Sequence, residues 1–157
     1  MKIPNNIQIK KVHDGKGLFA KQAIKKGTIV FRFRGKTGDM LHTNCRSLQI
    51  GENRFLESTA KFDDFLNHSC DPNCYIDWNT MNLVTLKNIS AGEELSFNYN
   101  TSEYDLCKQY GNISFSCLCG SKNCIRYVKG FRHLNFNQKR KIQDFISPFL
   151  RFKSISF

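Results

Sequence analysis

The amino-acid sequence predicts a mainly β fold with a few short helices. Residues 7–12 (IQIKKV) alternate apolar and polar side chains, and residues 28–33 (TIVFRF) are rich in β-branched and aromatic side chains. Both patterns are typical of strands, and the DGKG sequence at 14–17 between them is typical of a turn. Further short strands are predicted as a hairpin over 48–57 with its turn at 51–53, and over 81–89 and 94–99.

Helical periodicity is strongest near the end of the chain. Apolar side chains recur there at helical spacing, after the polar residues Asn135 and Asn137, and they are Ile142, Phe145, Ile146, Phe149 and Leu150. This pattern predicts a terminal amphipathic helix that packs on the core. Pro148 is expected to kink or end that helix, because proline lacks the backbone N–H that an interior position needs.

Composition indicates a folded chain with one sizeable core, since 40% of the 157 residues are hydrophobic and 13% are aromatic. Residues 1–11 lack the apolar core of a signal peptide, and no stretch reaches the roughly 20 apolar residues that span a bilayer. We therefore expect a soluble intracellular protein with no membrane partner. Seven cysteines without a secretion signal favour metal ligands or reduced thiols over disulfides.

Charge is distributed unevenly along the chain, whose formal net charge is +11. Residues 52–105 hold ten acids and three bases, a net of −7, whereas residues 1–51 and 106–157 each carry a net of +9. The basic flanks predict an acidic partner such as nucleic acid, and the acidic centre predicts a basic one. Solvated faces without a partner are the alternative.

A cluster of cysteines, Cys117, Cys119 and Cys124, predicts a metal site. Three thiols fall within eight residues, and Gly120 permits the tight turn that directs them to one point. A closed tetrahedral zinc site needs a fourth ligand from elsewhere in the chain. Spacing alone leaves four candidates: Cys45, Cys70, Cys74 and Cys107.

Three other segments carry unusual chemistry. Residues 14–20 (DGKGLFA) place two glycines before an apolar strand, where the backbone can approach a ligand, although a hairpin turn explains them equally well. Residues 65–73 (FLNHSCDPN) lead from an apolar pair into polar and reactive side chains and a proline-bounded turn. Residues 92–99 (GEELSFNY) end a predicted strand on which Phe97 and Tyr99 share a face.

In this order, the segments resemble the SET-domain protein lysine methyltransferases. GKGLFA is similar to the first cofactor motif of that family, NHSCDPN to the third, EELSFNY to the fourth, and CLCGSKNC to its cysteine-rich post-SET segment. The resemblance implies a SET-domain fold of several small sheets with a knot-like C-terminal threading. It divides the chain into a SET domain at 8–105, a post-SET zinc segment at 106–130, and a C-terminal helix and tail at 131–157.

The resemblance also implies roles for individual residues. Tyr99 is the expected catalytic tyrosine, and Cys70 becomes the fourth zinc ligand beside Cys117, Cys119 and Cys124. Phe97 and Phe33 are expected to line the substrate channel, Phe97 at the position that influences how many methyl groups are added. The expected contacts of S-adenosylmethionine are Lys16, Gly17, Leu18, Phe19, Asn67, His68, Tyr99 and Leu118.

The leading hypothesis is therefore a protein lysine N-methyltransferase that uses S-adenosylmethionine and Zn²⁺ and acts on a basic protein tail such as a histone. Phe33 stands where the family usually has a tyrosine, and Lys36 where it usually has a glutamate. These departures leave open a first alternative, a SET-like binding module without turnover. The second alternative is a basic zinc-containing nucleic-acid binder. If the protein is eukaryotic, viral or delivered to a host cell, the expected location is the nucleus or chromatin. Otherwise the expected location is the cytoplasm.

Overall fold

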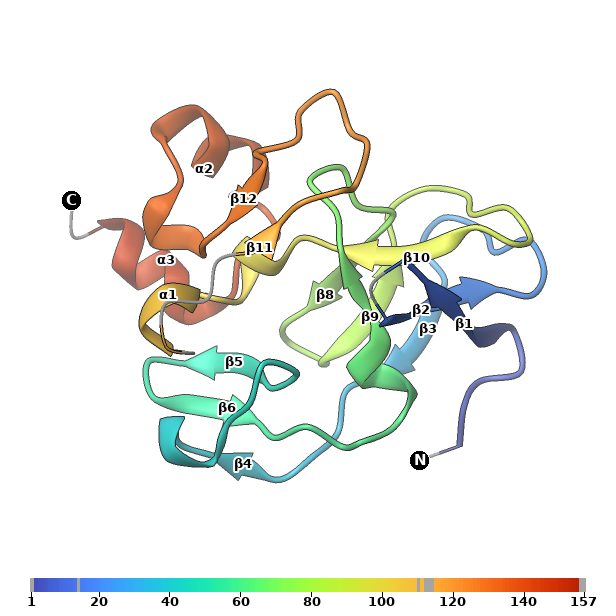
Figure 1. The fold of residues 1–157 in the computed structure, drawn as a ribbon, viewed down its shortest axis with the longest axis horizontal. Helices are drawn as coiled ribbons and strands as arrows, with labels where there is room; N and C mark the ends of the chain where they lie inside the picture. The colour runs from blue at the N-terminus through green and yellow to red at the C-terminus, as the bar shows by residue number, and fades with distance from the viewer. Residues whose placement is uncertain (1, 14, 110, 112–114, 156–157) are drawn as a thin grey trace.

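The structure, a computed structural model, describes residues 2–13, 15–109, 111 and 115–155. Within these residues the backbone forms four small β-sheets joined by short helical turns, and three short α-helices (Figure 1). The prediction of a mainly β fold with short helices is confirmed. The predicted turn at 14–17 includes residue 14, which lies outside the described residues, and the rest of that segment begins a strand.

The largest sheet brings together strands that are far apart in the sequence. Its order is β1-β2-β10-β7, with β1 and β2 antiparallel, β10 antiparallel to β2, and β7 parallel to β10. The strands are β1 (Ile7–Val12), β2 (Gly15–Ala20), β10 (Glu94–Phe97) and β7 (Asn67–His68). The sheet therefore places all three motif segments side by side.

Two three-stranded sheets and a two-stranded one complete the β structure. The order β3-β9-β8 joins β3 (Ile29–Arg32), β9 (Asn82–Thr85) and β8 (Cys74–Asp77). The order β4-β6-β5 joins β4 (Thr37–Gly38), β6 (Arg54–Leu56) and β5 (Leu48–Gly51), so the predicted hairpin over 48–57 is confirmed as β5 and β6. The short pair is β11 (Phe115–Ser116) with β12 (Tyr127–Val128).

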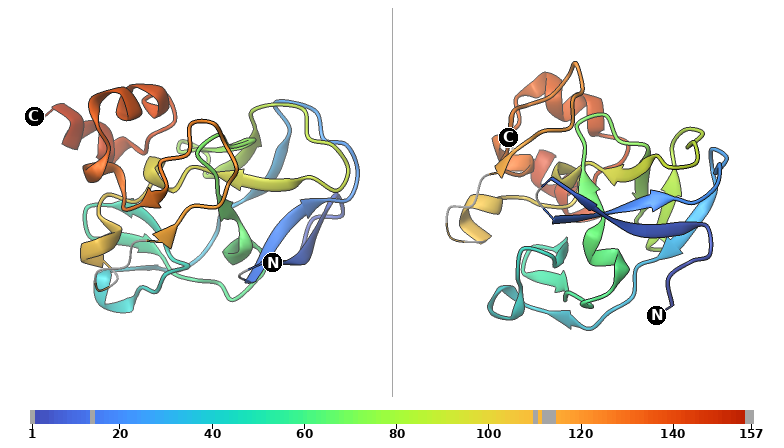
Figure 2. Two further views of the ribbon diagram at one scale, coloured as in Figure 1. Left: turned by 45° about the horizontal axis from the view of Figure 1, so that its top comes forward. Right: turned by 45° about the vertical axis from the view of Figure 1, so that its right-hand side comes forward.

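The helices are short. The 3₁₀ turns are η1 (Met40–His42), η2 (Phe62–Phe65), η3 (Tyr99–Thr101) and η4 (Phe131–His133), and the α-helices are α1 (Leu106–Gln109), α2 (Phe136–Ile142) and α3 (Pro148–Ile155). Helices α2 and α3 lie together at the end of the molecule away from β1 and β2 (Figures 1 and 2). Among the described residues, no helix has the length and apolar character to cross a membrane.

Three predictions about local structure are wrong. The single terminal helix is two helices, and Pro148 begins α3 rather than ending a helix, because the first helical position needs no N–H donor. Asn135 caps α2, accepting a hydrogen bond from the backbone N of Gln138. Strand β10 ends at Phe97, so Tyr99 lies in η3 and does not share a strand with it.

The hydrophobic core consists of three clusters that follow the order of the chain. The largest joins the sheets that contain β2, β8, β9 and β10, with Leu18, Leu83 and Leu95 fully buried. A second cluster packs η4 against α3 through Phe131 and Leu150, and a third surrounds the cysteine-rich segment. Trp78 links the first two regions by donating a hydrogen bond from Nε1 to the carbonyl of Phe145 at 2.8 Å.

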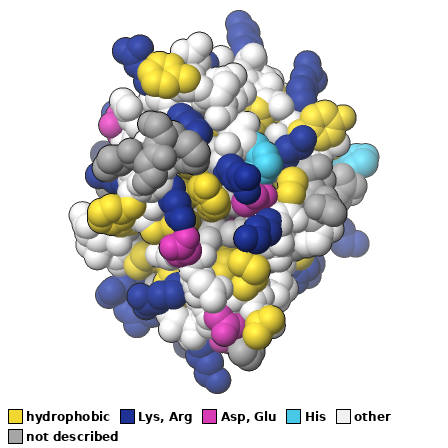
Figure 3. Space-filling view, turned by 90° about the vertical axis from the view of Figure 1, so that its left-hand side faces the viewer, with side chains coloured by type: hydrophobic (Ala, Val, Ile, Leu, Met, Phe, Trp, Pro, Cys, Tyr) yellow, Lys and Arg dark blue, Asp and Glu magenta, His cyan; other side chains and the backbone are white. Residues whose placement is uncertain are grey.

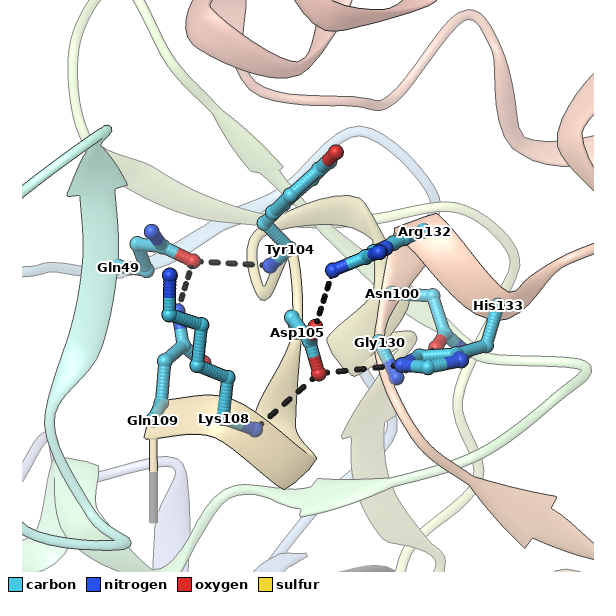
Figure 4. Close-up of polar contacts among 9 residues, drawn as sticks. All are labelled: Gln49, Asn100, Tyr104, Asp105, Lys108, Gln109, Gly130, Arg132 and His133. Atoms are coloured by element: carbon cyan, nitrogen blue, oxygen red, sulfur yellow. Dashed lines mark hydrogen bonds and ion pairs between the residues drawn. The ribbon is translucent and has the colours of Figure 1, made fainter. Parts of the chain in front are cut away.

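The segment after Tyr99 is clamped between β5 and the C-terminal part of the chain (Figure 4). The Gln49 side-chain oxygen accepts from the backbone N of Tyr104 at 2.8 Å, and Asp105 accepts from Arg132 at 3.1 Å. Gly130 is needed beside this segment, because it has φ +104 and a Cβ there would lie 2.7 Å from the carbonyl oxygen of Tyr104. These contacts fix residues 103–105 relative to Tyr99.

Candidate functional site

The three motif segments meet where β2, β7 and β10 pair. The Asn67 amide nitrogen donates to the carbonyl of Lys16 at 3.0 Å and to Glu94 Oε1 at 2.8 Å, so it ties all three strands together. A Cβ at Gly17 would lie 2.2 Å from Glu94 Oε1, so the end of the Glu94 side chain would have to move to admit one. The side chains that closely approach the backbone at Gly17 are those of Glu94 and Asn67.

The expected cofactor contacts on β2 point in different directions. Leu18 is fully buried in the core, so its side chain cannot reach a ligand and only its backbone remains for that purpose. Phe19 is half-buried, with the Lys10 ammonium 5.2 Å from its ring centre. The Lys16 ammonium lies 5.1 Å from the ring centre of Phe65, a cation–π contact near the surface.

His68 and Tyr99 are held against each other. The Tyr99 backbone N donates to His68 Nδ1 at 3.1 Å, and the ring centres lie 5.3 Å apart. Because Nδ1 accepts, the ring proton resides on Nε2, which lies 3.3 Å from the sulfur of Cys70. Burial lowers the pKa of His68 to about 4, so the imidazole is neutral and connects Tyr99 to the cysteine cluster.

The hydroxyl of Tyr99 is positioned by the backbone. It donates to the carbonyl of Leu66 at 2.9 Å, which leaves its oxygen lone pairs for a second partner. Burial raises the pKa of Tyr99, so the hydroxyl stays protonated. The ring centre of Phe97 lies 5.0 Å from that of Tyr99.

Tyr99 and Phe97 form part of the wall of a cavity of about 130 Å³. Both predicted channel residues, Phe33 and Phe97, line it, and Phe33 also packs edge-on against Phe31 with ring centres 5.0 Å apart. The charged residues in the wall are Arg46, Asp63, Asp64 and Glu103. An aromatic cavity with three carboxyl groups and one guanidinium suits a long apolar chain with a cationic end.

The sequence analysis did not single out several wall residues, among them Phe115 and Glu103. Phe115 lies on β11, 5.8 Å from Tyr99 and 6.2 Å from His68 between ring centres. Glu103 follows η3 and is buried. The position of Glu103 four residues after Tyr99 could have suggested a shared site, whereas nothing in the sequence marks Phe115.

The four expected metal ligands come together. The Sγ atoms of Cys70, Cys117, Cys119 and Cys124 all lie within 4.8 Å of one another, and those of Cys70 and Cys117 are 3.8 Å apart. Tetrahedral zinc–thiolate bonds of about 2.3 Å require sulfur–sulfur separations of about 3.8 Å, so the set fits zinc. Backbone N–H groups point at these sulfurs, from Ile125 to Cys70 at 3.5 Å and from Arg126 to Cys124 at 3.4 Å.

The rejected ligand candidates lie elsewhere. Cys74 is fully buried on β8, and burial raises the pKa of its thiol to about 12. Cys45 lines the aromatic cavity.

Leu118 lies between Cys117 and Cys119 and is 75% exposed, so its apolar side chain is available to cover a bound small molecule.

Comparisons with known proteins agree with this geometry. Residues 15–100 match the SET domain family. A Candida albicans protein named histone-lysine N-methyltransferase, H3 lysine-36 specific, is 31% identical over 137 residues, which cover 74% of this chain and 16% of the relative. A Gibberella zeae protein of the same name is 32% identical over 143 residues, covering 78% and 15%. This chain thus spans less than a fifth of the length of these relatives.

Solved structures show the same fold. The crystal structure of KRYPTONITE in complex with mCHG DNA and SAH aligns with a TM-score of 0.65 at 22% identity, covering 81% of this chain and 30% of that chain. The methyltransferase domain of human histone-lysine N-methyltransferase SETMAR aligns with a TM-score of 0.61 at 26% identity, covering 79% and 58%. The family match over more than half of the sequence and the shared fold show that the chain belongs to the SET-domain family.

Proposed function

We propose that this chain is a protein lysine N-methyltransferase that uses S-adenosylmethionine. The observation that carries the proposal is the aromatic, acid-lined cavity into whose wall Tyr99 is built. It suits the aliphatic stem and cationic end of a lysine side chain. Family membership and the names of the relatives support the same activity.

Bound S-adenosylmethionine would supply a methyl group activated by a positive sulfur. We propose that the side chains of Lys16, Asn67 and His68, the backbone of residues 17–19, and Leu118 hold it. Support comes from β2, β10 and β7, which bring the three motif segments together in one sheet, and from the exposed apolar surface of Leu118. These residues fit the cofactor, because the ammonium group of Lys16 suits its carboxylate and the exposed side chain of Leu118 suits its nucleobase ring.

Methyl transfer is an in-line displacement, and its demands on the protein are mainly positional. The Tyr99 hydroxyl, fixed on the Leu66 carbonyl, would accept a hydrogen bond from the target amine and orient its lone pair. Phe33, Phe97 and Phe115 would exclude water from the lysine stem. A dry cavity also lowers the pKa of the target amine, because burial disfavours its charged form.

The Cys70, Cys117, Cys119 and Cys124 cluster is proposed to hold one structural zinc ion. A closed four-thiolate site contributes folding free energy directly and offers no open position for catalysis. Its role would be to hold β11, β12 and Leu118 beside Tyr99.

The three hydrophobic clusters also support a division of the chain at about 105 and 130, because their buried residues lie at 7–97, 106–128 and 131–150.

A histone tail is the proposed substrate class, and chromatin the proposed place of action. The relatives are named for histone H3, and a homologous fold has been solved with an H3(1-15) peptide. The carboxyl groups of Asp63, Asp64 and Glu103 at the cavity favour a basic peptide despite the net charge of +11. The test is methyl transfer from labelled cofactor to recombinant histones, followed by mass-spectrometric mapping of the lysine.

Nucleic acid is a proposed second partner, through the basic flanks. Lys and Arg side chains are spread over the face in Figure 3, and α2 ends in Lys139, Arg140 and Lys141. Phosphate contacts release counterions, so rising salt should weaken binding to nucleosomes more steeply than binding to a histone peptide. Replacing those three residues with glutamine should flatten the nucleosome slope and leave peptide turnover unchanged. Equal slopes for nucleosome and peptide would contradict this partner.

A further inference from the structure

Glu103 is a buried acid in the wall of the cavity that contains Tyr99. It is 5% exposed and lines the cavity together with Phe97, Tyr99 and Phe115. Its backbone N donates to the carbonyl of Tyr99 at 2.8 Å, so the two residues are one helical turn apart and move as a unit. The same wall also contains Arg46, Asp63 and Asp64.

Only half of the Glu103 carboxyl group is satisfied by the protein. Oε1 accepts from the backbone N of Gln49 at 3.1 Å and from the Ser102 hydroxyl at 3.1 Å. Oε2 is buried and has no hydrogen-bond partner among the described residues. A buried carboxyl oxygen without a partner costs on the order of 1–3 kcal/mol. A donor group on a ligand in the cavity would satisfy this oxygen.

The backbone at Glu103 and Tyr104 is held on both sides by hydrogen bonds from other segments. The carbonyl of Glu103 accepts from the backbone N of Phe131 at 2.8 Å, and the next residue, Tyr104, is bonded to Gln49 (Figure 4). The one guanidinium in the cavity wall, that of Arg46, lies 5.6 Å from the ring centre of Phe65. The described residues show no ion pair between Arg46 and Glu103.

We propose that Glu103 is a catalytic residue that receives the target lysine: Oε2 accepts a hydrogen bond from the ammonium group and takes its proton before methyl transfer. This inference rests on the proposed function. One N–H bond breaks and its electron pair stays on nitrogen as the lone pair that attacks the methyl group. One O–H bond forms on Glu103, which becomes neutral. The proton returns to water through the cavity mouth after the product leaves.

The acidity of Glu103 suits this task. Burial raises its pKa to about 7, which lies near the working pH of an intracellular enzyme, where a general base is most effective. Hydrogen bonds from Gln49 and Ser102 oppose the rise. The other titratable or charged groups that face the cavity are Cys45, Arg46, Asp63, Asp64 and Tyr99. Asp63 and Asp64 already accept hydrogen bonds from the side chains of Thr59 and Ser58, and Tyr99 stays protonated.

The test compares the parent chain with Glu103→Gln, which keeps the shape and the Oε1 acceptor but removes the base. On a histone peptide that the parent methylates, kcat/KM of Glu103→Gln at pH 8 should fall roughly 10²-fold or more. The inflection near pH 7 in the parent's rate profile should disappear. The control is Glu52→Gln, an exposed carboxylate paired with Lys153 outside the cavity, which should keep the parent's rate and profile.

A binding measurement on the parent alone does not depend on the folding of a variant. The same peptide is compared with one that carries norleucine, which has no charged end, at the target position. At pH 8 the parent should prefer lysine by roughly tenfold or more, and the preference should shrink at pH 6, where Glu103 is neutral. Both peptides are measured without cofactor.

The outcomes separate the two proposals. A parent that binds no S-adenosylmethionine and methylates no histone overturns the proposed function and this inference with it. An active parent whose lysine preference does not change with pH, or a folded Glu103→Gln with the parent's rate and pH profile, overturns the inference alone. If Glu103→Gln does not fold, Glu103→Asp replaces it, because withdrawing the carboxylate by one methylene should still lower the rate at least tenfold.

Discussion

Replacing Glu103 with glutamine should change how the stability of the folded chain depends on pH. The folded-state pKa of about 7 lies above the ordinary value of 4.5, a difference worth about 3 kcal/mol. Between these two values the folded chain binds more protons than the unfolded chain. The contribution of Glu103 to the free energy of unfolding of the parent should therefore be greatest below pH 4.5 and should be lost as the pH rises through about 7.

Glu103→Gln cannot ionise, so this fall should be missing from it. The assay is urea denaturation of both proteins at intervals from pH 4.5 to 8, in which the difference between the two free energies of unfolding is plotted against pH. Other titrating groups contribute equally to both proteins and cancel. A constant offset, from the new amide that replaces Oε2, does not affect the slope. Relative to the parent, the variant should gain about 3 kcal/mol over this range.

Ser102→Ala is the matched control, because it removes a hydroxyl that donates to Glu103 Oε1 and keeps the carboxyl group. That hydrogen bond lowers the pKa of Glu103, so the control should retain the parent's pH dependence and extend it to higher pH. Parallel curves for the parent and Glu103→Gln from pH 4.5 to 8 would refute the reasoning, since they would mean that the carboxyl group is solvated in the folded chain.

Four further changes test the site and the fold. Tyr99→Phe should lower turnover roughly 10²-fold, about 2.7 kcal/mol of barrier, with calorimetry showing unchanged cofactor affinity; near-normal turnover would contradict its catalytic role. Cys119→Ser should lower the metal content measured by atomic emission from one ion per chain and lower the melting temperature, unless the cluster binds no metal. Phe97→Tyr should shift the products from dimethyl and trimethyl lysine to monomethyl lysine by mass spectrometry, and a parent that only monomethylates would count against this. Gly130→Ala should destabilise the chain by about 2 kcal/mol or more in urea denaturation. Its control, Gly27→Ala, should cost about 1 kcal/mol, because Gly27 has φ +80 but open space around it. Equal effects would exclude the close contact of a Cβ at residue 130 with the Tyr104 carbonyl.

Features that depend on neighbouring residues could be predicted from the sequence. Strand pattern and turn chemistry placed β1, β3 and the β5–β6 hairpin, because side-chain alternation and local backbone preference are set within a few positions. The spacing of Cys117, Cys119 and Cys124 predicted for the same reason a thiol cluster, and the structure brings these three together with Cys70. The order of the motif segments pointed to Tyr99, and this assignment needed the resemblance, since a tyrosine near a phenylalanine is ordinary in any core.

Contacts between distant segments could not be predicted from the sequence, because they depend on how the chain packs. Cys70 lies 47 positions from Cys117, and its choice over Cys74 follows from which sulfur the packing of β7 and β11 brings within reach. Pro148 starts a helix because the chain turns at 143–147 to pack η4 against α3, which periodicity cannot show. From the local sequence, Glu103 is expected to be an ordinary surface acid. In the fold, the backbone N of Gln49, 54 positions away, donates to its Oε1. Burial by remote residues, rather than the local sequence, raises its pKa and makes it a candidate base.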